Sequence, residues 1–133
     1  MTYRKAYLWF SAIGLFPVAL SYGVAPVESL NWLFGMTLAV PDEAHIFRGI
    51  MGLYLAMVLL WVIGALRESF ERPAIIAEVF FMSGLAAGRL LSVIVDGVPH
   101  WLLSGYLAVE IALAVAGIAL LRPRHPQDSF GRS

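Results

Sequence analysis

Four long apolar segments constrain the fold of this chain more than any other feature of the sequence. A transmembrane α-helix needs about 20 predominantly apolar residues, and its backbone satisfies its own hydrogen bonds inside lipid. The chain has 133 residues, of which only 14% are charged. We therefore expect an all-α fold, a four-transmembrane-helix bundle. The predicted helices cover about residues 6–24, 46–66, 73–95 and 101–121.

These helices leave room for only one domain. We expect a single membrane domain over residues 1–121 and a polar cytoplasmic tail over 122–133. The uncharged run 6–27 is longer than the core of a signal peptide, and further spans follow it, so it is predicted to be the first membrane helix. Pro17 is expected to kink this helix, and Pro73 suits the first turn of the third helix.

Composition excludes several kinds of protein. The chain has no cysteine, which excludes disulfide frameworks, thiol nucleophiles and Cys-ligated metal centres. Its formal net charge is zero, so it has no basic footprint for nucleic acid.

The segment 27–40 is apolar but too short to cross a bilayer. It is predicted to be either a re-entrant or an interfacial piece between the first two helices. Trp32 suits the headgroup level of a membrane.

The distribution of Lys and Arg predicts the orientation. Four spans place the N-terminus, the loop between the second and third helices, and the tail on one side. The loops of the other side contain acids but no Lys or Arg, so both termini are expected to face the cytoplasm. The cationic side holds Arg4, Lys5, Arg67, Arg72, Arg122, Arg124 and Arg132.

Charged residues inside the third segment point to a polar interior. At 100° per residue, Glu78, Arg89 and Asp96 lie within about 20° of one another on one helix face. Charged groups in membrane helices face the bundle rather than lipid. Gly84 and Gly88, on the opposing side, would permit close contact with another helix.

Depth predicts how these charges pair. Arg89 and Glu110 lie at depths of roughly 10 and 14 Å from the same surface, so an ion pair between them is expected. Arg48 enters the second helix from that surface, with Asp96 as its natural partner. Glu78, near the cytoplasmic end, is expected to snorkel or to cap its helix. The predicted polar cluster or ligand-binding site comprises Arg48, Arg89, Ser92, Asp96 and Glu110.

The cluster has a structural alternative. Two closed ion pairs can fix helix register without binding anything. Tyr54 and Tyr106 lie near the same level and could line a pocket, although packing explains them more readily than chemistry. Ser92 and Ser104 are expected to bond to their own helix backbone, and no histidine near them predicts a hydrolase.

Histidines of the extracytoplasmic rim offer a metal site as a further alternative. His45 and His100, with the neighbouring acids, could hold a metal or a pigment, but their spacing matches no strong template. We therefore predict no metal. His125 is expected to be exposed in the tail.

Two stretches, Arg48–Leu55 and Gly88–Ser92, the latter followed by Asp96-Gly-Val-Pro and Glu110, resemble the bacterial membrane family named domain of unknown function 4345. The resemblance covers about residues 14–121. It implies a four-helix protein of the bacterial inner membrane in which the five cluster residues are signature polar positions. It implies no activity.

Three functions remain open. The first is a non-catalytic accessory subunit or a protein that binds an amphiphile such as a lipid, quinone or pigment. The second is a membrane enzyme with Glu110 or Asp96 as general acid or base. The third is an oligomeric small-molecule transporter. We favour the first, and expect membrane lipids, a larger membrane complex or a homo-oligomer as partners, with no cofactor beyond a bound amphiphile.

Overall fold

The computed structural model describes residues 2–123, and within this range the chain forms five α-helices and no strand. Four of these helices are long and apolar enough to cross a membrane, which confirms the predicted all-α architecture. The tail predicted for 122–133 and its His125 lie outside the described residues beyond Pro123. The helices are α1 (Tyr3–Gly23), α2 (Pro26–Phe34), α3 (Asp42–Leu66), α4 (Glu68–Asp96) and α5 (Trp101–Leu121).

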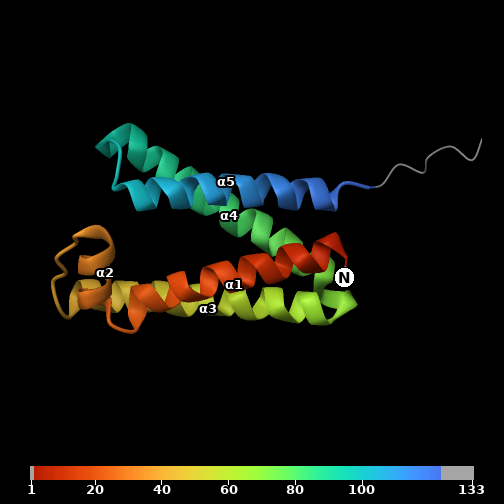
Figure 1. Ribbon diagram of the computed structural model, residues 1–133, viewed down its shortest axis with the longest axis horizontal. Helices are drawn as coiled ribbons and strands as arrows, with labels where there is room; N and C mark the ends of the chain where they lie inside the picture. The colour runs from red at the N-terminus through yellow and green to blue at the C-terminus, as the bar shows by residue number, and fades with distance from the viewer. Residues whose placement is uncertain (1, 124–133) are drawn as a thin grey trace, which may run out of the picture.

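The long helices form two antiparallel pairs (Figure 1). In one pair α1 lies along α3, with the most extensive contact in the fold. In the other, α4 runs diagonally away from α3 and packs against α5. The helix α4 therefore connects the two pairs, and its Asp96 end lies far from α3 (Figure 1).

Three helices begin earlier than the hydropathy predicts, α1 by three residues, α3 by four and α4 by five. The helix α3 starts at Asp42 and α4 at Glu68, because acidic residues occupy their first turns and interact favourably with the helix dipole. Pro73 consequently lies inside α4, not in its first turn, so that prediction is wrong.

The segment 27–40 is a short helix followed by extended chain. Pro26 starts α2 at a position where a proline loses no hydrogen bond. Gly35 ends it in the left-handed conformation with φ 69°, which glycine adopts without steric cost. In Figure 1, α2 lies at the end of the bundle, beside the start of α3. Leu30 is buried, whereas Trp32 is exposed.

Close helix contacts occur at glycines other than the pair expected from the sequence. A Cβ atom added at Gly84 or Gly88 would meet nothing within 4 Å, so the prediction of a contact there is wrong. A Cβ at Gly117 would instead lie 2.6 Å from the Tyr7 hydroxyl and 2.6 Å from Val79 Cγ2. Gly117 thus allows α1, α4 and α5 to meet closely near the N-terminal end of α1.

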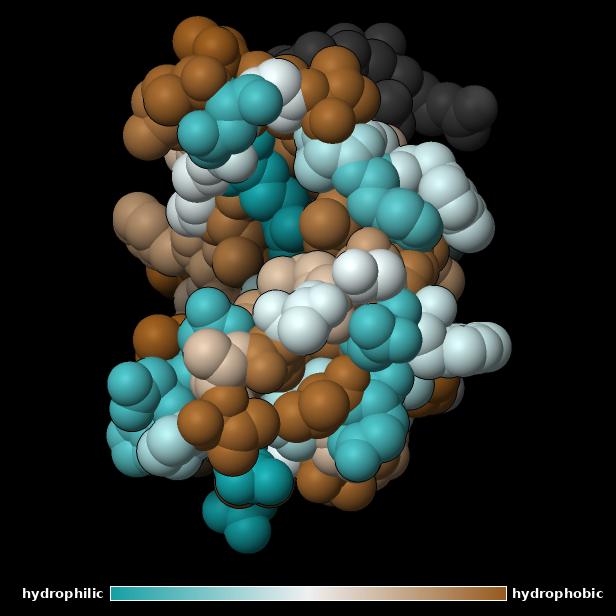
Figure 2. Space-filling model, turned by 90° about the vertical axis from the view of Figure 1, so that its left-hand side faces the viewer, coloured by the Kyte–Doolittle hydropathy of each residue, from teal (hydrophilic) through white to brown (hydrophobic). Residues whose placement is uncertain are grey.

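The opposite end of the molecule carries a mixed surface. Figure 2 views the end that bears α2 and the turn between α4 and α5, where hydrophilic and hydrophobic residues alternate. Trp32, Val98 and Trp101 are strongly exposed on these segments. Exposed tryptophan is common at the headgroup level of membrane proteins.

Candidate functional site

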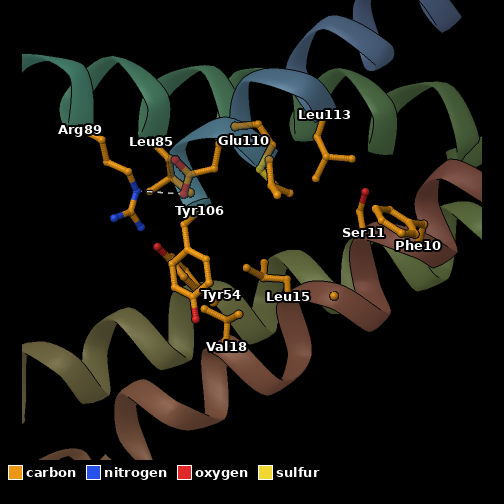
Figure 3. A pocket seen from close by; sticks show the side chains of 13 residues that line it. Phe10, Ser11, Leu15, Val18, Tyr54, Leu85, Arg89, Tyr106, Glu110 and Leu113 are labelled. Atoms are coloured by element: carbon orange, nitrogen blue, oxygen red, sulfur yellow. Dashed lines mark hydrogen bonds and ion pairs between the residues drawn. The ribbon is translucent and has the colours of Figure 1, made fainter. Parts of the chain in front are cut away.

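A cavity of about 200 Å³ lies between the two helix pairs. It forms where α1 and α5 separate beyond their contact at Gly117, and its walls are almost entirely apolar. Figure 3 shows side chains from α1, α3, α4 and α5 converging on it. The lining residues are Phe10, Ser11, Gly14, Leu15, Val18, Tyr54, Met82, Leu85, Arg89, Tyr106, Val109, Glu110 and Leu113.

An ion pair forms one wall of this cavity. Arg89 Nε of α4 donates a hydrogen bond to Glu110 Oε1 of α5 over 2.9 Å, which confirms the predicted pairing. The side chains are 23% and 9% exposed, so the pair is largely shielded from the surroundings. The Arg89 guanidinium also lies 6.0 Å from the centre of the Tyr106 ring, within range of a cation–π contact.

Two buried oxygen atoms of the site have no hydrogen-bond partner. They are Glu110 Oε2, on the side of the carboxylate that Arg89 leaves free, and Ser11 Oγ of α1. Both residues line the cavity, from opposite helix pairs (Figure 3). Both atoms have almost no surface accessible to water, and Ser11 lies beside the buried Glu78. An unpaired buried polar atom is costly.

Aromatic side chains form the rest of the wall nearest α2. Tyr54 and Tyr106 are among the lining residues. Phe34 of α2 packs edge-on against Tyr106, with ring centres 6.2 Å apart. It also contacts the His100 ring. The short helix therefore covers the side of the cavity wall that faces the end of the bundle.

The structure does not bring Arg48 and Asp96 together. Arg48 Nε donates to the Gly23 carbonyl at the end of α1, and Asp96 accepts from Ser92 Oγ over 3.0 Å. The predicted Arg48–Asp96 pair is therefore wrong. The reason is topological: α3 pairs with α1, while the Asp96 end of α4 diverges toward α5 (Figure 1). Neither Arg48, Ser92 nor Asp96 lines the cavity.

Glu78 occupies an unexpected position. It neither snorkels nor caps: the residue is fully buried, and neither carboxyl oxygen has a hydrogen-bond partner. The hydroxyl groups of Ser11 and Tyr7 lie beside it. The expectation failed because α4 begins five residues earlier than predicted, so Glu78 lies well inside the helix and faces the core.

His45 and His100 belong to no cluster of possible metal ligands in the described part of the chain. Among residues 2–123, no cluster of three or more His, Cys, Asp or Glu side chains could hold a metal ion. His45 is exposed, and His100 Nδ1 accepts a hydrogen bond from the Leu102 amide as the N-cap of α5. Ser104 bonds back to the His100 carbonyl, as expected.

Sequence reasoning missed two polar groups of α1. In the sequence, Ser11 is an ordinary small residue of a membrane helix. Its place at the cavity depends on how α1 packs against the other helix pair. Tyr7 donates to the Leu113 carbonyl over 2.7 Å and holds the closed end of the bundle. A weak signal exists, because Arg4, Tyr7 and Ser11 recur at helical spacing along one face.

Comparison with known proteins identifies a family but no characterised relative. No curated protein and no solved structure is significantly similar to the chain. The family model described as domain of unknown function DUF4345 matches residues 3–121, nearly the whole length. This chain belongs to the DUF4345 family.

Proposed function

We propose that this protein is a multi-pass membrane protein that binds an amphiphile in the cavity between its two helix pairs. The observation that carries the proposal is a cavity with apolar walls and a few convergent polar groups, Arg89, Glu110 and Ser11. This combination is typical of small-molecule binding sites. An apolar wall suits a hydrocarbon chain, and the polar groups suit a head group.

The proposed setting is the bacterial inner membrane, with both termini in the cytoplasm. The bias of Lys and Arg toward one side supports this orientation. Glu110 is the tenth residue of α5, roughly 14 Å from the start of that helix. This depth is near the middle of a hydrocarbon core of about 30 Å.

Access from the bilayer is the proposed route of entry. Phe10 of α1 and Val109 of α5 line the cavity but are 66% and 51% exposed on the outer surface. They therefore mark an opening between α1 and α5 that faces sideways, where lipid would surround the bundle. A ligand dissolved in the membrane could enter there without crossing water.

Size limits the occupant. A dry cavity of about 150 Å³ in another protein holds one benzene molecule. The present cavity, about 200 Å³, can accept one ring or a short length of chain, with the rest of an amphiphile extending through the opening.

An enzyme is a second candidate, favoured by one observation. Glu110 lines the cavity and one of its carboxylate oxygens has no hydrogen-bond partner, so it could act as a general base. Its other oxygen is engaged by Arg89, and Asp96 does not line the cavity, so the site offers one carboxylate and no second acid. Binding without chemistry is the simpler function for this arrangement.

The test is to ask what co-purifies with the protein after gentle extraction. Gly14 lines the cavity, and a Cβ added there would meet nothing within 4 Å, so the position has room for the first atom of a side chain and Gly14→Leu is expected to narrow the cavity. Gly84→Leu is the matched control, because Gly84 is equally open and lies away from the cavity. We expect mass spectrometry to find a small molecule on the wild type and on Gly84→Leu but not on Gly14→Leu.

Two results would contradict the proposal. One is that no small molecule accompanies the wild type in any mild detergent. The other is that Gly14→Leu retains as much bound molecule as Gly84→Leu. Recovery of a chemically altered amphiphile, dependent on Glu110, would favour the enzyme instead.

A further inference from the structure

A second hollow, the terminal cleft, lies at the end of the bundle opposite α2, where α1 and α4 begin and α5 ends (Figure 1). Its volume is about 490 Å³, and it shares no lining residue with the cavity between the helix pairs. The charged residues that line the terminal cleft are Arg4, Glu71, Arg72 and Arg122. They come from three different helix ends, so the folded chain brings them together.

The terminal cleft has an excess of positive charge. Three guanidinium groups and one carboxylate line it, which gives a formal charge of +2. The protein itself uses Arg4, whose Nε and Nη2 donate to the Leu120 carbonyl over 3.2 and 2.9 Å and whose Nη1 lies 3.7 Å from Glu71 Oε1. Arg72 and Arg122 are exposed, and in the part of the chain that the structure describes neither forms an ion pair. Both charges are therefore available to an anion.

The level of the terminal cleft favours a lipid as the source of that anion. The helices α1 and α5 have 21 residues each, and this length corresponds to roughly 31 Å of rise. A bilayer has a hydrocarbon core of about 30 Å, so the helix ends at the cleft lie at the head-group level of the proposed membrane. The bias of Lys and Arg places this end on the cytoplasmic side, where the leaflet contains anionic phospholipids.

We propose that the terminal cleft binds the head group of an anionic phospholipid, with Arg72 and Arg122 donating hydrogen bonds to its phosphate. A guanidinium group is always protonated, and its paired N–H donors match the oxygens of a phosphate. Basic pockets between membrane helices on the cytoplasmic side bind such head groups in other proteins. Thr2 and Tyr3 also line the cleft, so the positive end of the α1 dipole adds to the attraction. The site uses the proposed membrane setting but does not depend on the amphiphile in the cavity.

Native mass spectrometry of the full chain in detergent tests the proposal with three probes. They are phosphatidylglycerol, phosphatidylcholine with the same acyl chains, and glycerol phosphate, a soluble ester that offers the same phosphate oxygens without the chains. Each Arg near a membrane surface strengthens binding of an anionic lipid about fivefold. We therefore expect phosphatidylglycerol to bind about 25-fold more tightly than phosphatidylcholine. Equal binding of the two lipids overturns the proposal, and glycerol phosphate that binds as tightly as phosphatidylglycerol overturns the lipid as the source.

Neutral variants assign the effect to the two free cations. Arg72→Gln and Arg122→Gln should each lower the affinity for phosphatidylglycerol about fivefold, and the double variant about 25-fold, with no change for phosphatidylcholine. Arg67→Gln is the matched control, because Arg67 is exposed on the same side of the membrane but does not line the cleft. It should change the affinity little. An equal loss in Arg67→Gln would show a diffuse attraction to the surface and overturn the cleft as the site.

A variant with the opposite expected effect controls for a loss of folding. Glu71→Gln removes a carboxylate that lines the cleft, while Arg4 keeps both hydrogen bonds to the Leu120 carbonyl. Phosphatidylglycerol should then bind about fivefold more tightly, and unchanged or weaker binding overturns the proposal. Gly14→Leu, which changes the other cavity, should leave the binding of phosphatidylglycerol unchanged. A loss in Gly14→Leu would place the lipid in that cavity and overturn the terminal cleft as its site.

Discussion

Arg89 and Glu110 face each other across α4 and α5, with Arg89 Nε 2.9 Å from Glu110 Oε1. The pair joins two helices that are adjacent along the chain, and it stands at the edge of the cavity rather than in packed core. One carboxylate oxygen is therefore held by protein while the other remains free. The pair can stabilise the bundle and contribute to a binding site at the same time.

Removing one partner of this pair should destabilise the protein more than removing both. Arg89→Leu leaves a shielded carboxylate without its cation, and the free energy of unfolding should fall by about 3–5 kcal/mol. Arg89→Leu combined with Glu110→Leu should be nearly neutral. Denaturation in mixed micelles measures both. Arg48→Leu is the control and should cost at most about 1 kcal/mol. A double variant as unstable as the single one would show that the pair does not act as a unit.

Glu78 should be replaceable by an apolar residue at a gain in stability. Its carboxyl group is fully buried and unpaired, and each such group costs about 1–3 kcal/mol. Glu78→Leu removes this cost, so the free energy of unfolding should rise by about that amount. The exposed Glu28→Leu should change it little. A loss of stability in Glu78→Leu would instead mean that the carboxyl group is satisfied, by the neighbouring Ser11 hydroxyl or by a bound water.

Gly117 should resist substitution while Gly88 tolerates it. Gly117→Leu would force Tyr7 and Val79 aside and separate α1 from α5, at a cost of about 1–3 kcal/mol from overpacking. A Cβ at Gly88 meets no neighbour within 4 Å, so Gly88→Leu should gain up to about 1 kcal/mol from helix propensity. Thermal denaturation of the two variants compares them directly. Equal stability would contradict the close contact at Gly117.

Loss of Phe34 should weaken ligand retention without unfolding the bundle. Phe34→Ala removes the ring that covers Tyr106 and His100, so the dissociation rate of a bound amphiphile should rise several-fold. Trp32→Ala removes a ring of the same helix that is 84% exposed, and it should leave that rate unchanged. Dissociation can be followed by exchange with an isotope-labelled amphiphile. Equal rates in both variants would show that α2 does not cover the site.

The predicted orientation can be tested by labelling, because the chain has no native cysteine. Ser69→Cys lies at the start of α4, near Arg67 and Arg72, and Val98→Cys lies in the turn between α4 and α5. A membrane-impermeant maleimide should label Val98→Cys in intact spheroplasts and Ser69→Cys only after permeabilisation. The opposite pattern would invert the proposed topology.

Much of the fold, and the ion-paired part of the site, could be predicted from the sequence. Hydropathy and helix periodicity are local properties, so they located the four long helices, the short segment before α3, and the inward position of Arg89. The Arg89–Glu110 pair was also predictable, because α4 and α5 are joined by a short turn that fixes their relative depth. Helix starts were less predictable, since Asp42 and Glu68 extend their helices beyond the apolar runs.

Only the tertiary structure decided which helices meet. A sequence states no crossing angle, so it could not show that α4 leaves α3 and carries Asp96 away from Arg48. Nor could it show that Gly117 closes one end of the bundle while α1 and α5 separate at the other. That separation creates the cavity, whereas the close meeting of α1, α4 and α5 near Gly117 encloses Glu78 in the core beside Ser11. These are contacts between residues distant in the chain, and they depend on how side chains of several helices fit together at once.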